Sequence, residues 1–194
     1  MRLRHSLRDT RGQTLVEFAM VLPLLIVVAF GVVEFGYMLL DQHVVTKMTR
    51  EGSNLISRNT TLGDAATVMR NMSTRPVNFD ANSKLIFSVI RNVSTVGAPN
   101  YNTPVLYERY EYGTLARYST LNTRGPATFG NPPEYQAPNS DSNTNLQVTN
   151  LPANIISLGG MLYVTEIYTQ HPRLTPLQNF GITIPSVLYS IAYF

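Results

Sequence analysis

The chain has 194 residues, of which 44% are apolar, 10% are aromatic and only 14% are charged. Soluble domains carry roughly 25% charged residues, so the low charged fraction indicates a membrane or an assembled surface. The chain has no cysteine, which excludes disulfides, zinc–thiolate sites, iron–sulfur clusters and thiol nucleophiles.

The positive charge of the chain lies at its N-terminus. The net charge is +3, and residues 1–12 hold one aspartate and four arginines, which are Arg2, Arg4, Arg8 and Arg11. The other 182 residues carry eleven basic and eleven acidic side chains. The basic character therefore belongs to a leader and not to a surface for phosphates, so we expect no nucleic acid partner.

An apolar run follows this basic leader. No charge occurs from Phe18 to Val33, and after Glu34 the apolar character continues through Phe35–Leu40. One helix of about 20 residues can therefore cross the hydrocarbon core. The arginines on the short N-terminal side predict a cytoplasmic N-terminus, with the bulk of the chain outside. Pro23, inside the run, predicts a kink or a loosened backbone bond.

A secretory signal peptide has the same general form. Two features argue against it: the apolar stretch is long, and no small-x-small cleavage site ends it before Glu34. Apolar side chains also continue beyond the run with helical spacing, at Tyr37, Leu40, Val44, Met48 and Leu55. The sequence thus predicts that the membrane helix continues as an amphipathic helix. We expect its stripe to pack against the chain's own outer domain, with a partner helix as the alternative.

Gly12 and Glu17 stand where the leader meets the apolar run. A carboxylate near a membrane is costly, although Glu17 could simply snorkel to the interface. Gly12, five residues earlier, leaves an accessible and weakly helical backbone that suits a protease. Cleavage after Gly12 would create an amine at Gln13, a cation that could offset the Glu17 carboxylate.

The residues Arg11–Ala19 (RGQTLVEFA), with Pro23 and then Glu34-Phe35-Gly36, resemble the N-terminus of TadE-like minor pilins. These belong to the tight-adherence (Tad, or Flp) pilus, a branch of the type IV pilus systems. In that family a prepilin peptidase cuts after the glycine that lies five positions before the glutamate. The resemblance implies a cut between Gly12 and Gln13, with Glu17 and Phe18 following in the mature chain. A mature chain starting at Gln13 favours the Tad branch over type IVa pilins, which start with phenylalanine.

The resemblance also implies a function and a location. The chain would be a pilin or pseudopilin that supports Tad pilus assembly, in contact with the prepilin peptidase, the assembly platform, other pilins and inner-membrane lipid. We expect a leader at 1–12, a transmembrane and amphipathic helix at 13–58, and a periplasmic α+β domain at 59–194. The alternatives are a TadF-like partner subunit and an uncleaved, membrane-anchored periplasmic binding or sensing domain.

The outer part predicts a short helix and a sheet. Thr61–Asp64 has the spacing of a capping box, and a helix that starts there should end before Arg75-Pro76. Four β-branched and aromatic runs follow, at 84–93, 105–112, 161–170 and 186–194. They predict an antiparallel sheet of about four strands, and hence an α+β fold. The polar segment 119–150 predicts a long surface excursion, either flexible or held by a partner.

We find no sequence pattern for chemistry. The three histidines, His5, His43 and His171, are scattered along the chain. Asp141–Asn145 imitates the start of a calcium loop, but Leu146 replaces its glycine and Pro152 its bidentate glutamate. No Walker loop, dinucleotide fingerprint or nucleophile elbow is present. The sequence therefore predicts no enzyme, no cofactor and no metal site, and it predicts solvated turns in the asparagine-rich loop.

Overall fold

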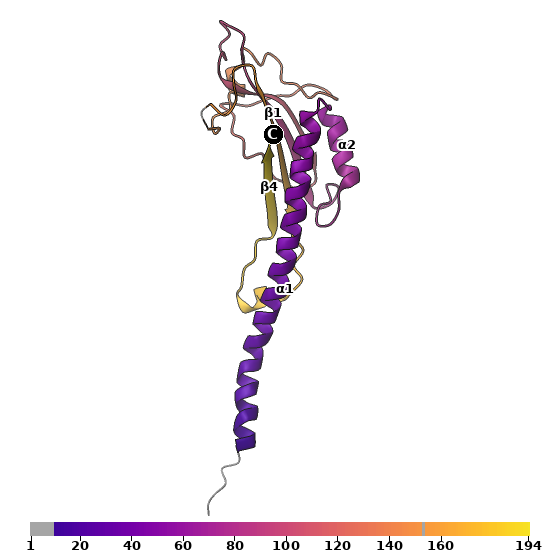
Figure 1. Cartoon of the computed structure of the whole chain (residues 1–194), viewed down its shortest axis with the longest axis vertical. Coiled ribbons are helices and arrows are strands. Elements are labelled where there is room, and N and C mark those ends of the chain that lie inside the picture. The colour runs from indigo at the N-terminus through magenta and orange to yellow at the C-terminus, as the bar shows by residue number, and fades with distance from the viewer. Residues whose placement is uncertain (1–9, 153) are drawn as a thin grey trace, which may run out of the picture. The chain divides into compact units, whose positions relative to one another are not determined.

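The structure, a computed structural model, describes residues 10–152 and 154–194 (Figure 1). The chain forms two compact units. One contains the chain as far as Leu39 together with Arg173–Ile184, and the other contains Leu40–Pro172 with Pro185–Phe194. Helix α1 (Thr10–Ser57) runs through both units. The predicted α+β fold, with a long N-terminal helix, a second short helix and a four-stranded antiparallel sheet, is confirmed.

The first unit consists of α1 up to Leu39 and a segment that contains the short 3-10 helix η2 (Leu177–Phe180). The helix is continuous through Pro23. It exposes large apolar side chains, such as Met20 at 77% and Leu24 at 65%. By length and composition, Gly12–Ser57 can cross a membrane, and none of its most apolar window is buried.

The second unit is built on the sheet, in the strand order β2-β1-β3-β4. Its strands are β1 (Ser83–Asn92), β2 (Pro104–Gly113), β3 (Met161–Gln170) and β4 (Val187–Tyr193). Every neighbouring pair is antiparallel. The four apolar runs therefore form the four strands that the sequence predicts.

One face of the sheet packs against the C-terminal half of α1. The buried positions on this part of the helix are Val45, Met48, Thr49, Gly52, Ser53 and Ile56. A Cβ atom at Gly52 would lie 2.8 Å from Thr165 Cγ2 and 3.1 Å from Phe87 Cε1, so the helix approaches the sheet closely because Gly52 has no side chain. Of the five residues of the predicted stripe, Met48 is buried, Val44 and Leu55 are half-buried, and Tyr37 and Leu40 are exposed. The contact therefore combines apolar side chains (Val45, Met48 and Ile56) with small residues that allow a close approach (Thr49, Gly52 and Ser53).

Helix α2 (Leu62–Met72) begins as its capping box predicts. Thr61 is the N-cap, and its Oγ1 accepts a hydrogen bond of 3.2 Å from the backbone N–H of Asp64. The helix buries Leu62 and Met69 but leaves Met72 53% exposed. It ends before Arg75-Pro76, in agreement with the sequence prediction.

The other face of the sheet is covered by the connection between β2 and β3. Leu162 and Val164 point away from the face that carries Thr165, because side chains alternate along a strand. They form one buried cluster with residues of the connection, among them Leu121 and Val148. Isolated apolar residues within the polar segment therefore fold part of the predicted surface excursion onto the chain's own sheet.

Polar contacts hold the same connection. The carboxylate of Glu166 on β3 is fully buried and accepts hydrogen bonds from the backbone N–H (2.8 Å) and hydroxyl (2.7 Å) of Thr120. Tyr189 on β4 donates to the same oxygen at 3.0 Å. Burial and the nearby carboxylate raise the pKa of Tyr189, so its hydroxyl stays protonated and remains a donor. Asp141, the first residue of the failed calcium loop, accepts hydrogen bonds from Arg91 and Thr95 instead.

Candidate functional site

The start of α1 carries the residues that the sequence singles out for processing. The helix begins at Thr10, so Gly12 lies in its first turn, where backbone N–H groups have no partner inside the helix. A Cβ atom at Gly12 would meet no other atom within 4 Å. A protease could therefore reach the backbone here after only one turn of helix unwinds. Arg2, Arg4 and Arg8 lie outside the described residues, and so does the side chain of Arg11.

Gln13 and Glu17 lie on one face of the helix, one turn apart. The Gln13 side-chain amide donates a hydrogen bond of 3.0 Å to Glu17 Oε1, and both side chains are exposed. Phe18, the next residue, is 60% exposed. Helix geometry thus brings position 13 within hydrogen-bond reach of the Glu17 carboxylate.

The apolar surface that follows surrounds the helix. Most side chains from Leu15 to Val33 are exposed, with large apolar ones reaching exposures of 41% to 77%, whereas Val27 and Phe30 are half-buried. A helix that is apolar on all sides and exposed to this degree cannot be stable in water as it stands. Lipid or other apolar helices are the environments that suit it.

Glu34 has a role in the first unit that sequence reasoning missed. Its carboxyl group is only 1% exposed. It accepts hydrogen bonds from the backbone N–H of Leu174 (3.2 Å), and from the backbone N–H (2.9 Å) and hydroxyl (2.7 Å) of Thr175. We call Arg173–Ile184 the covering loop, because it buries this carboxyl group beside a small cavity of about 50 Å³.

A second long-range contact lies within the second unit. His171 Nδ1 and Asp41 Oδ2 are 2.7 Å apart, and the His171 side chain is fully buried. In the sequence, His171 is only one of three histidines scattered along the chain. The contact connects the end of β3 to α1. The two residues are 130 positions apart in the sequence, so no local pattern could predict the contact.

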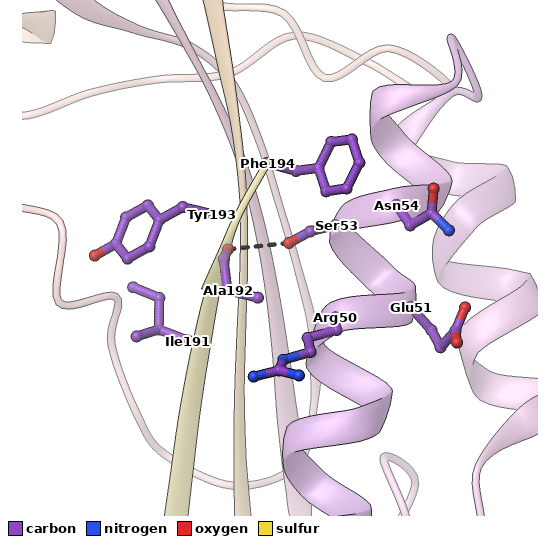
Figure 2. Close-up of a pocket in the computed structure, with 8 residues that line it drawn as sticks. All are labelled: Arg50, Glu51, Ser53, Asn54, Ile191, Ala192, Tyr193 and Phe194. Carbon is purple, nitrogen blue, oxygen red and sulfur yellow. Dashed lines mark hydrogen bonds between the residues drawn. The ribbon is translucent and has the colours of Figure 1, made fainter. Parts of the chain in front are cut away.

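A shallow groove of about 530 Å³ lies between α1 and the end of β4 (Figure 2). Its helix side carries Arg50, Glu51, Ser53 and Asn54, and its strand side consists of residues 191–194. The Ser53 hydroxyl donates a hydrogen bond of 3.0 Å to the carbonyl of Ala192, shown dashed in Figure 2. This hydroxyl therefore joins helix to strand. Among residues 10–152 and 154–194, no group of three or more His, Cys, Asp or Glu side chains could hold a metal ion.

Comparison with known proteins points to the N-terminal helix. Residues 12–54 match the family model described as TadE-like protein. The match begins at Gly12 and ends on the part of α1 that packs against the sheet, so over this segment the chain is similar to TadE-like proteins. No curated protein sequence and no solved structure gives a significant match to the chain.

Proposed function

We propose that this chain, TadE-like in its N-terminal segment, is a minor pilin or pseudopilin that supports assembly of a Tad-type pilus. The match to TadE-like proteins over residues 12–54 is the observation that carries the proposal. That family is not enzymatic in general, which supports an assembly role over a catalytic one.

Processing comes first. A prepilin peptidase would cut between Gly12 and Gln13 and so remove the basic leader at 1–12. The exposed first turn of α1, open around Gly12, supports this site. The leader arginines favour retention of that end in the cytoplasm, so the cut would occur at the cytoplasmic face.

Assembly would then use the new N-terminus. Cleavage gives Gln13 a free amine one helical turn from Glu17, on the same subunit or on a neighbour. In low-dielectric surroundings such a pair favours one axial register of packed helices over others. Glu17 would therefore serve specificity of assembly more than stability of the fold.

The location follows from the same helix. Residues 13–58 would anchor the chain once in the bacterial inner membrane, with 59–194 as an α+β domain in the periplasm. Its partners would be the prepilin peptidase, the assembly platform, other pilins and the lipid of that membrane. A TadF-like partner subunit, or an uncleaved membrane-anchored binding or sensing domain, is the alternative.

N-terminal sequencing of the membrane-extracted protein tests the proposal. We expect Gln13 as the first residue. A chain that still begins at Met1 in cells with active peptidase would contradict processing and favour the anchored-domain alternative. Complementation of strains that lack either the TadE-like or the TadF-like subunit separates the two pilin roles.

Two variants test the site itself. Gly12→Leu should insert but remain uncut, whereas Gly31→Leu, with equally open space around it, should be cut as usual. Glu17→Leu should insert and be cut, but should fail to support piliation. Normal piliation with Glu17→Leu would mean that this carboxylate only snorkels to the membrane surface.

A further inference from the structure

The two carboxyl groups that flank the uncharged run are too close together for both to lie outside the hydrocarbon core of a bilayer. Glu17 and Glu34 are seventeen residues apart. An α-helix covers this interval in about 26 Å, whereas the hydrocarbon core is about 30 Å thick. Tilting the helix shortens its span along the membrane normal further. With Glu17 at the edge near the N-terminus, Glu34 lies inside the hydrocarbon, close to the opposite edge.

The covering loop supplies hydrogen-bond donors to Glu34 at that depth. An uncovered carboxylate in hydrocarbon is unfavourable, and so are backbone N–H groups without acceptors. Here the Glu34 carboxyl group accepts hydrogen bonds from the backbone N–H groups of Leu174 and Thr175. The carboxylate gains donors and the two N–H groups gain an acceptor. The loop must therefore lie at the depth of Glu34.

The outward surface of the covering loop carries three large apolar side chains. Leu174 is 52% exposed, Phe180 is 58% exposed and Ile182 is 38% exposed, whereas Leu177 is buried. On α1, within two turns of Glu34, Tyr37 and Leu39 are exposed as well. The exposed polar residues of the loop include Arg173, Gln178 and Asn179, and the Arg173 guanidinium donates a hydrogen bond to the side-chain oxygen of Gln178. A long arginine side chain can keep its stem in apolar surroundings while its charged end stays with polar groups near the interface.

We propose that the covering loop is seated in the lipid of the leaflet far from the N-terminus, with Leu174, Phe180 and Ile182 in contact with acyl chains. The occupant is lipid and not water, because Glu34 fixes the loop at a depth where lipid surrounds α1. This inference rests on the proposed membrane crossing of α1. It adds a second membrane contact, made by a segment that lies between the last two strands.

The absence of tryptophan and cysteine makes a fluorescence test direct. The full chain is reconstituted in phosphatidylcholine vesicles, with or without bromine on the acyl chains, which quenches tryptophan on contact. Phe180→Trp reports on the loop. Leu24→Trp, in the middle of the apolar run, is the control for membrane crossing. Tyr118→Trp, at an aromatic position that is 85% exposed in the second unit, is the matched control for water.

We expect brominated lipid to reduce the emission of Phe180→Trp and Leu24→Trp, and to leave Tyr118→Trp unchanged. Quenching at Leu24→Trp without quenching at Phe180→Trp would overturn the loop proposal and leave the membrane helix intact. Unquenched but blue-shifted emission at Phe180→Trp would also overturn it, because a second copy or another pilin would then cover the loop. Absence of quenching at Leu24→Trp would overturn the membrane crossing and the loop proposal together.

Discussion

The two halves of α1 differ in how hydrophobicity relates to burial. The N-terminal half carries large apolar side chains and buries almost none of them, whereas the C-terminal half buries Val45, Met48 and Ile56 together with the small residues Thr49, Gly52 and Ser53. The N-terminal half suits a lipid environment, in which apolar side chains can be exposed without being covered by protein. The second half matches a sheet surface, against which a small side chain allows a close approach. Hydrophobicity alone therefore identifies the apolar half of α1 but does not reveal the close approach at Gly52.

The largest expected effect comes from filling the space at Gly52. Gly52→Leu would force side-chain atoms into Thr165 and Phe87 and should lower the free energy of unfolding by about 3 kcal/mol. Gly36→Leu, where no other atom lies within 4 Å, should leave it unchanged. Thermal unfolding of the full chain in detergent measures both. Equal effects of the two variants would contradict the conclusion that α1 is closely packed at Gly52 and open at Gly36.

Loss of the Glu34 carboxyl group should loosen the covering loop alone. Glu34→Ala removes the acceptor for Leu174 and Thr175, and should reduce their protection from amide exchange by about 2 kcal/mol, or roughly thirtyfold. Hydrogen exchange of the reconstituted chain measures the protection of these two amides. Glu17→Ala is the matched control on the same helix and should leave these amides protected. Unchanged exchange with Glu34→Ala would mean that the loop is held by other contacts.

A smaller effect is expected from the hydrogen bond between helix and strand. Ser53→Ala removes the donor to the Ala192 carbonyl and should cost about 1 kcal/mol of unfolding free energy. Ser57→Ala removes a bond of 2.9 Å to Asn54 within the same helix and should cost less. Denaturant unfolding of the two variants side by side provides the comparison. A greater loss with Ser57→Ala would contradict the role given to Ser53.

The smallest effect is expected at the exposed end of α1. Gln13→Ala removes an exposed hydrogen bond to Glu17 and should change neither membrane insertion nor unfolding measurably. Extraction from membranes and thermal unfolding test this. A clear loss of insertion would show that the Gln13 side chain stabilises the Glu17 carboxylate in the uncleaved chain, before cleavage gives Gln13 a free amine.

Sequence reasoning succeeded where the signal is local. The apolar run, the capping box at Thr61 and the four β-rich runs each lie within a few consecutive residues, and each forms the expected element. It failed in part on the buried face of α1: Gly52 packs by close approach and adds nothing to a hydrophobic stripe, and the predicted stripe omitted the buried Val45 and Ile56.

Long-range contacts account for the other failures. Leu121 and Val148 are isolated apolar residues in a polar stretch, so no periodicity marks them as core. Glu34 could have raised suspicion, since a carboxylate inside an apolar run needs a partner. Nothing in the sequence, however, indicates that the partner lies at Leu174 and Thr175.

The contact between Glu34 and Thr175 joins positions 141 residues apart, and this separation sets an order of events in biogenesis. The chain is synthesised from its N-terminus, so α1 is made long before the covering loop exists. Under the proposed membrane crossing, the uncharged run from Phe18 to Val33 must therefore carry an uncovered Glu34 into the membrane. The loop then arrives as part of the connection to β4, and the sheet gains its last strand only after that connection has formed. Burial of a single carboxyl group thus becomes a late step of maturation.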